Sequence, residues 1–198
     1  MIKIYHAPRS RSSRILWLAE ELGVRYEVEL VPIKRGDGTG EPAPDSYLAI
    51  HPHKKVPAIE HEGWIVFESA AIVLYLTDTF QRIKMGPSVG EWDRAPYVSW
   101  LFYYASTVEP AITAQFAKIE GAANAFVPWA DVEKRIADTL TKTPYIMGDR
   151  FTGADILFGS MVMFLKGSLM QANPVYDEYL ARLMERPAFQ RAQERDNG

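Results

Sequence analysis

The periodicity of apolar side chains changes near residue 79, and this change limits the folds that the chain can adopt. Before it, strand and helix signals alternate. Residues 2–4 and 26–30 carry apolar side chains at every second position, whereas residues 14–22 carry them along one helical face. Beyond residue 79 the apolar repeats are helical. The sequence therefore predicts a unit of strands and helices followed by an all-helical unit.

A hairpin and a helix complete the first predicted unit. Apolar runs at residues 56–60 and 64–67 flank a tight turn, which is typical of two antiparallel strands, and residues 69–78 continue as a helix. Glycine and proline residues predict a surface loop over residues 32–44 and a linker over residues 79–91. We expect domains at residues 1–78 and 92–198, the second with helices at about 92–119, 128–140, 152–168, 175–185 and 187–195.

The overall composition excludes several classes of partner and site. The net charge of −3 provides no basic field for nucleic acid or an anionic membrane, and no apolar run approaches the roughly 20 residues of a membrane span. The absence of cysteine excludes disulfides, thiolate zinc sites and a cysteine nucleophile. His51, His53 and His61 lack the helical spacing of a metal site, and no secretion signal follows Met1. We expect a cytoplasmic protein without a metal.

Two dipeptides around the predicted hairpin indicate a site for an extended peptide ligand. A cis bond between Val56 and Pro57 would leave the Val56 backbone N–H and C=O available to a ligand. Glu68 and Ser69 stand where a strand changes to a helix, so Glu68 can pair with an ammonium while Ser69 and adjoining N–H groups hold a carboxylate. Taken singly, an edge-strand proline and a helix cap are the simpler interpretations. Their combination favours recognition of an α-amino acid end.

The loop between the first predicted strand and helix, residues 6–14, is rich in arginine and serine side chains. We call it the serine loop. A hydroxyl here lies at the positive end of a helix among cations, a setting that favours a thiolate over a thiol. Because a free thiol has a pKa of about 8.5, one hydrogen bond and the helix field suffice to lower it by a unit, or about 1.4 kcal/mol. Arg9, Arg11 and Arg14 repel one another unless an anion relieves them, which favours a ligand loop over a capped helix with solvated charges.

These motifs, in this order along nearly the whole chain, resemble the glutathione transferases. The resemblance implies a thioredoxin-like α/β domain that binds glutathione, followed by an all-α domain that holds an apolar co-substrate. It implies that Glu68 and Ser69 hold the γ-glutamyl group of glutathione and that the Val56 backbone, before Pro57, holds its cysteinyl unit.

The resemblance also extends to residues outside these two dipeptides. Lys54 or Lys55 is expected to neutralise the glycyl carboxylate of glutathione, although exposed lysines are more often part of a solvated surface. The co-substrate pocket of the resembled family lies between the first long helix of the second domain and the serine loop. Tyr5, Tyr103 and Tyr104 are therefore candidates to line it.

The resemblance leaves the identity of the activating residue partly open. Serine-type members carry the activating serine four residues before an arginine, and Arg14 in that role selects Ser10. Ser12 and Ser13 are then expected to cap the helix. Arg11 stands where beta-type members carry a cysteine, so the class is not assigned, and Ser12 and Arg11 remain alternatives to Ser10.

The resemblance implies an enzyme of detoxification that adds the glutathione thiolate to a small electrophile. Isomerisation, dehalogenation and peroxide reduction use the same thiolate, and the sequence does not separate them. It also implies a homodimer. The alternative is a binding protein that keeps the fold without turnover. A third motif, Thr152 with Asp155, has the spacing of a helix-capping arrangement and is assigned to folding.

Overall fold

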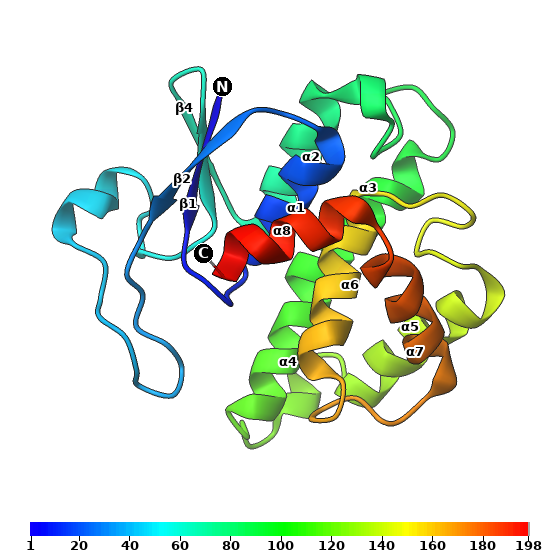
Figure 1. Cartoon of the computed structure of the whole chain (residues 1–198). Coiled ribbons are helices and arrows are strands. Elements are labelled where there is room, and N and C mark those ends of the chain that lie inside the picture. Colours follow the sequence, from blue (N-terminus) through cyan, green and yellow to red (C-terminus); the bar gives the residue numbers. More distant parts are fainter. Residues whose placement is uncertain (198) are drawn as a thin grey trace. The chain divides into compact units, whose positions relative to one another are not determined.

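A four-stranded mixed sheet forms the centre of the first unit (Figure 1). The structure, a computed structural model, describes residues 1–197. The strands, in the spatial order β2-β1-β3-β4, pair in parallel between β1 and β2 and antiparallel elsewhere. Their bounds are Ile2–His6 (β1), Tyr26–Leu30 (β2), Ala58–His61 (β3) and Trp64–Phe67 (β4). The predicted order of strands and helices is thus confirmed.

Helices and turns connect these strands as their sequences predict. Helix α1 (Ser13–Leu22) joins β1 to β2, buries an almost continuous run of side chains and ends at Gly23 in a left-handed conformation. The β3–β4 turn contains Glu62 and Gly63, both with positive φ, as a tight two-residue hairpin requires. Helix α2 (Ser69–Thr79) follows β4, and a 3₁₀ turn (Asp45–Ala49) lies between β2 and β3.

The C-terminal helix α8 (Pro187–Asn197) belongs to the first unit, which comprises residues 1–76 and 185 onward. It packs on α1, where the rings of Trp17 and Phe189 meet edge to face at 5.1 Å. Beside them the Arg186 guanidinium forms a two-pronged pair with the Glu21 carboxylate at 2.6 and 2.7 Å. The predicted domain of residues 92–198 had placed this helix with the other helices. The apolar periodicity of a sequence identifies a helix but not the surface against which that helix packs. Gly198, the last residue of the predicted domain, lies outside the described residues.

Helices alone make up the second unit, residues 77–184, apart from short turns. The predicted long helix over 92–119 consists of three consecutive helical segments, of which the middle one is a π-helical turn. Helix α6 is buried along most of its length and packs against α3 and α7. The bounds are Arg94–Tyr103 (α3), Tyr104–Val108 (the π turn), Glu109–Phe116 (α4), Trp129–Lys142 (α5), Gly153–Leu165 (α6) and Pro174–Met184 (α7).

Two sequence features of this unit have a clear structural outcome. Thr152 and Asp155 form the predicted capping arrangement at the start of α6. The Thr152 hydroxyl accepts the Ala154 N–H at 3.3 Å, and the Asp155 carboxylate accepts the Thr152 N–H at 2.9 Å. The segment predicted as a linker, by contrast, packs into the unit. Met85 is buried, its C=O accepts the Gly153 N–H at 2.7 Å, and a Cβ on Gly86 would approach the Tyr97 ring within 2.9 Å.

Candidate functional site

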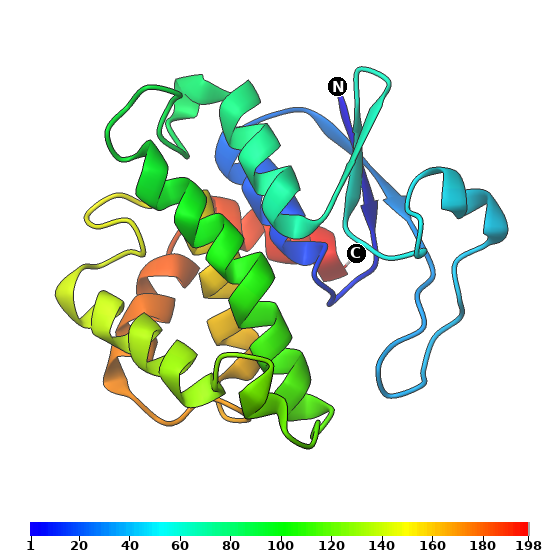
Figure 2. The ribbon, with the colours of Figure 1, turned by 180° about the vertical axis from the view of Figure 1, so that it is seen from behind.

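The register of the sheet brings three loops of the first unit to one end of it. Tyr5 of β1 is the partner of Ala58 in β3, and Ala58 is the partner of Phe67 in β4. The chain therefore leaves β1, enters β3 and leaves β4 at the same end. The serine loop, the Val56–Pro57 pair and the Glu68–Ser69 pair all follow or precede these positions directly. The C-terminal end of α8 lies beside the serine loop in both views (Figures 1 and 2).

The Val56–Pro57 bond is cis, as predicted, and Pro57 is buried. Among the described residues, neither the N–H nor the C=O of Val56 has a hydrogen-bond partner within the chain. A backbone donor and acceptor on one residue are what an added extended peptide pairs with.

Glu68 adopts a left-handed conformation, with a φ of 71°. For a residue with a side chain this conformation costs roughly 1–2 kcal/mol, and such strain concentrates at functional sites. The Glu68 side chain is exposed, while its C=O accepts the Ile72 N–H at 2.9 Å as the first bond of α2. Ser69, half-buried, begins that helix. The strained residue thus stands immediately before a helix start, with its side chain exposed.

Ser12 does not cap α1 with its side chain, contrary to the prediction. Its hydroxyl is fully buried and turns back toward the end of β1, where it accepts the Ala7 N–H at 3.0 Å and lies 2.8 Å from the His6 Nδ1. The Ser10 hydroxyl lies 2.7 Å from the Ser12 Oγ and accepts the Ser12 N–H at 3.1 Å. Ser10 is half-buried and is therefore the more accessible end of the pair.

Asp196, in the last turn of α8, forms hydrogen bonds with the serine loop. Its carboxylate accepts the Arg9 N–H at 3.1–3.2 Å and the Ser13 hydroxyl at 2.5 Å. Its Oδ1 also lies 3.2 Å from the buried Nε2 of His6, at an angle unsuited to a hydrogen bond. The anion expected among the arginines of this loop is thus partly supplied by the chain itself. Sequence reasoning missed Asp196, because no local signal links two positions 187 residues apart.

His6 lies at the C-terminal end of β1 with its side chain almost wholly inaccessible to solvent. Burial lowers the pKa of His6 below its ordinary value, and the nearby Asp196 carboxylate opposes this shift. The ring is therefore neutral at physiological pH, and the negative charge beside it makes it a better proton acceptor than burial alone would allow.

The two predicted lysines differ in their surroundings. The Lys54 ammonium is paired with the Asp45 carboxylate, and this hydrogen bond lowers the Asp45 pKa. The Lys55 side chain is exposed, and its backbone C=O accepts the Tyr47 hydroxyl at 3.1 Å. Lys55 is therefore the more available cation for a ligand carboxylate.

The three tyrosines predicted for a co-substrate pocket lie mostly in the interiors of their own units. Tyr5 is 3% exposed, and burial, assisted by the bond to Glu60, raises its pKa to about 12. Tyr104 is 2% exposed and donates to Glu109 at 2.8 Å. Tyr103 is half-buried beneath the Arg135 guanidinium. This packing does not favour a pocket-lining role for Tyr5 or Tyr104, and Tyr103 is the best exposed of the three.

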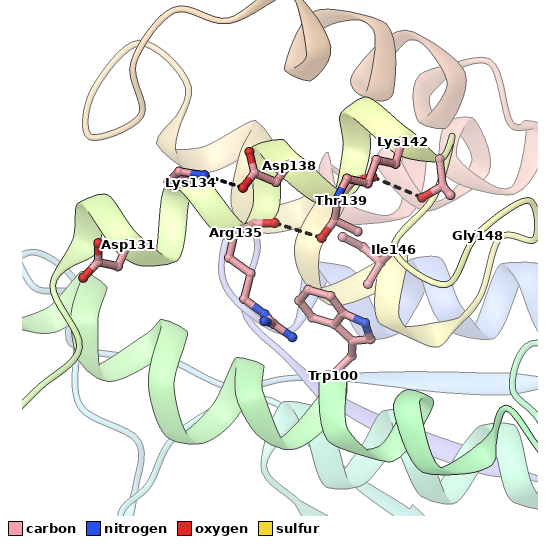
Figure 3. A pocket seen from close by; sticks show the side chains of 10 residues that line it. Trp100, Asp131, Lys134, Arg135, Asp138, Thr139, Lys142, Ile146 and Gly148 are labelled. Carbon is pink, nitrogen blue, oxygen red and sulfur yellow. Dashed lines mark hydrogen bonds and ion pairs between the residues drawn. The ribbon is translucent and has the colours of Figure 1, made fainter.

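A cavity of about 520 Å³ lies within the helical unit, along α5 (Figure 3). The Arg135 guanidinium points toward Trp100 and lies 4.8 Å from its ring centroid. Asp131, Arg135, Asp138 and Lys142 share one helix face at spacings of three and four residues, a signal that sequence reasoning did not use. With Lys134, which also lines the cavity, three cationic and two carboxylate side chains surround it.

Two further observations concern metals and membranes. Within residues 1–197, no group of three or more carboxylate, imidazole or thiol side chains is arranged to hold a metal ion. No helix in this part of the chain has both the length and the apolar character needed for a membrane crossing.

Comparisons with known proteins give consistent relatives. Residues 1–78 match the family model described as glutathione S-transferase, N-terminal domain. The chain is 30% identical to an uncharacterized GST-like protein of Streptococcus mutans, over 89% of this chain and 74% of that protein. It is 29% identical to the disulfide-bond oxidoreductase YfcG of Escherichia coli, over 79% of this chain and 76% of that protein.

Some curated relatives are longer than this chain. It is 35% identical to glutathione S-transferase 3 of Schizosaccharomyces pombe, over 58% of this chain and 45% of that protein. The chain thus spans less than half of this relative. It spans 61–62% of the length of two glutathione S-transferase domain-containing proteins of Dictyostelium discoideum.

Solved structures confirm the predicted fold class. A glutathione S-transferase from Actinobacillus pleuropneumoniae, 26% identical, superposes with a TM-score of 0.83 over 100% of this chain and 94% of its own. A sphingomonad glutathione S-transferase solved with glutathione, 23% identical, gives a TM-score of 0.82 over 98% of each chain.

Proposed function

The chain belongs to the glutathione transferase family, and we propose that it binds glutathione at the end of its sheet and activates the thiol as a thiolate. The thiolate then attacks a small, largely apolar electrophile, in the manner of a detoxifying enzyme. Positioning and control of the thiol pKa are the main contributions of the protein to such a reaction.

The placement of Ser10 carries this proposal. Its hydroxyl is held by the Ser12 N–H and Oγ just before the start of α1, where helix N–H groups favour negative charge. Because Ser10 is half-buried, a thiol can approach its hydroxyl, whereas the Ser12 hydroxyl behind it is fully buried. A hydrogen bond to a charged acceptor contributes about 1.5–3 kcal/mol, which corresponds to one to two units of thiol pKa.

The other two loops at this end of the sheet supply candidate contacts for the rest of glutathione. The Val56 N–H and C=O are available for the cysteinyl backbone. Glu68 and Ser69 are available for the γ-glutamyl end, and Lys55 is available for the glycyl carboxylate. The three contacts require an extended tripeptide across the sheet end.

A comparison of Ser10→Ala with Ser99→Ala tests the proposal. Ser99 lies on an exposed face of α3 and donates to the Ala95 C=O, so its loss controls for the loss of a hydroxyl. Calorimetry measures glutathione affinity, and the ultraviolet thiolate absorbance, titrated against pH, gives the pKa of bound glutathione. We expect Ser10→Ala to raise that pKa by about one to two units and Ser99→Ala to leave it unchanged. An unshifted curve for Ser10→Ala refutes its role, and the absence of glutathione binding refutes the function.

A second candidate reaction is glutathione-dependent reduction of disulfides, favoured by the similarity to the disulfide-bond oxidoreductase YfcG. The absence of cysteine removes a protein thiol but not the glutathione thiolate, which can itself attack a disulfide. Turnover with an electrophile panel and with a small disulfide separates the two reactions. Glutathione binding without turnover of either class identifies a non-catalytic binding protein.

We also propose that the protein is a homodimer, as its family membership suggests. The exposed Trp64 and Leu48 side chains of the first unit are apolar surface that a partner would cover. Sedimentation at micromolar concentration should give twice the monomer mass, and a purely monomeric species would contradict this proposal.

A further inference from the structure

Four side chains form a continuous line of polar contacts from α8 to the candidate thiol site. Oδ1 of Asp196 lies 3.2 Å from Nε2 of His6. Nδ1 of His6 lies 2.8 Å from the Ser12 Oγ, which lies 2.7 Å from the Ser10 Oγ. We call this line the Asp196–Ser10 chain. His6, Ser12 and Asp196 are buried, and only Ser10 is accessible.

Hydrogen-bond capacity restricts how protons are distributed along this chain. A hydroxyl has one hydrogen and two lone pairs, and one lone pair of Ser12 is taken by the Ala7 N–H. The Ser12 hydroxyl has two acceptors in reach, the His6 Nδ1 at 2.8 Å and the Ala7 C=O at 3.2 Å. With a neutral His6 protonated on Nε2, toward Asp196, the Ser12 hydroxyl donates to the closer acceptor, Nδ1. Its remaining lone pair then accepts the Ser10 hydroxyl. Ser10 itself accepts the Ser12 N–H and keeps one lone pair for the S–H of a thiol.

The same positions accommodate the opposite arrangement equally well. If Nδ1 also carries a proton, the Ser12 Oγ accepts from Nδ1 and from the Ala7 N–H, and its hydrogen points to Ser10. The Ser10 hydroxyl then points outward and donates to a thiolate. Every donor and acceptor of the two hydroxyls is used in both arrangements. They differ by the transfer of one proton along the chain.

We propose that His6 accepts the thiol proton of bound glutathione through Ser10 and Ser12, and that Asp196 stabilises the resulting imidazolium. This proposal rests on the proposed function. The S–H bond breaks and an O–H bond forms on Ser10, whose former proton passes to Ser12. The former Ser12 proton forms the N–H bond on Nδ1. The thiolate keeps the electron pair, and no proton leaves the complex.

The surroundings of His6 suit this task. A proton acceptor must be neutral before the transfer, and burial lowers the His6 pKa, as described above. After the transfer the imidazolium lies between the Asp196 carboxylate and the thiolate at the far end of the chain. The angle at Nε2 is poor for a neutral hydrogen bond, but charge attraction at 3.2 Å does not depend on it. Asp196 is itself held by the Arg9 N–H and the Ser13 hydroxyl.

Proton counting tests the proposal directly. Glutathione is added to the protein at pH 7 in weakly buffered solution with a pH indicator, while thiolate absorbance is recorded. S-methylglutathione, which lacks the ionisable thiol, gives the proton change caused by the rest of the ligand. We expect the wild-type protein to form the thiolate and release almost no proton. His6→Asn should release about one proton for each thiolate formed, since the amide stays polar but takes up no proton.

Two α8 variants distinguish the carboxylate from the helix. Asp196→Asn keeps the shape and one oxygen that can accept from the Arg9 N–H and the Ser13 hydroxyl, but it removes the charge, so it should release protons as His6→Asn does. Arg191→Ala loosens the contact of α8 with Glu20 but leaves the Asp196–Ser10 chain unchanged. It should therefore keep the wild-type number of protons released per thiolate formed. The wild-type measurement decides the proposal even if a variant fails to fold.

The outcomes separate the two proposals. Release of about one proton per thiolate by the wild-type protein overturns the role of His6 and leaves glutathione activation intact. If glutathione binds without a thiolate band, or does not bind, the proposed function fails together with the transfer. In labelled protein, an imidazolium ¹⁵N signal on glutathione binding, absent in His6→Asn, independently supports the transfer, and its absence refutes it.

Discussion

Replacing Ser12 with alanine should destabilise the protein more than the loss of a helix cap does. Its hydroxyl is fully buried and serves the Ala7 N–H, the His6 Nδ1 and the Ser10 hydroxyl. Alanine leaves the first two polar groups buried without a partner. A buried group that loses its partner costs about 1–3 kcal/mol, so for two such groups we expect a loss of about 2–6 kcal/mol in the free energy of unfolding. Loss of a cap alone would cost about 1 kcal/mol.

Urea denaturation of Ser12→Ala and Ser99→Ala, followed by tryptophan fluorescence and circular dichroism, measures this difference. Ser99→Ala should stay within about 0.5 kcal/mol of the wild-type value, since its hydroxyl is exposed. The bound glutathione of Ser12→Ala should also show a raised thiol pKa, because the Ser10 hydroxyl loses its support. A stability loss below about 1 kcal/mol with an unchanged thiolate titration would refute the inference that Ser12 organises the site.

Three further perturbations have expected outcomes of different kinds. Burial raises the Asp155 pKa to about 6, so its contribution to stability is greatest below pH 4 and falls by about 3 kcal/mol as the pH rises through 6. Urea unfolding from pH 4 to 7 should show this fall in the difference between the wild-type protein and Asp155→Asn, and a constant difference contradicts it. Glu68→Gly should keep or raise stability by up to about 1 kcal/mol while calorimetric glutathione affinity drops about tenfold, whereas Glu62→Gly, at another positive φ, should leave affinity unchanged. Arg186→Met leaves the nearly buried Glu21 carboxylate without its two-pronged partner and should cost about 2 kcal/mol in chemical denaturation, and a loss under about 0.5 kcal/mol would show that solvent compensates.

Elements fixed by local periodicity could be predicted from the sequence. Strand β2 has the predicted bounds of Tyr26–Leu30, and α1 begins one residue before the predicted Arg14. The hairpin turn follows from Glu62 and Gly63. The Val56–Pro57 bond is also cis, the form that a ligand-binding role of the Val56 backbone requires. These features depend on neighbouring residues, so a single sequence contains the necessary information.

Features that depend on depth and distant contacts could not be predicted in the same way. Ser10 and Ser12 have the same side chain, and only the fold makes one accessible and the other buried. Tyr5 was expected at a pocket, but it packs with Tyr47 at a ring distance of 5.5 Å, because the connection after β2 covers that face of the sheet. The contact of Asp196 with the serine loop joins opposite ends of the sequence, so local apolar periodicity does not predict it.

The assignment of α8 to the first unit has a consequence for synthesis on the ribosome. Residues 1–76 emerge first, yet the helix that covers α1 and supplies Asp196 begins after residue 185. At roughly 5–20 residues per second, the intervening segment takes roughly 5–20 s to synthesise. During this interval the apolar surface around Trp17 is available to chaperones, and the serine loop lacks its carboxylate. A prematurely terminated chain would therefore carry an incomplete version of the proposed thiol site, even if its sheet were fully formed.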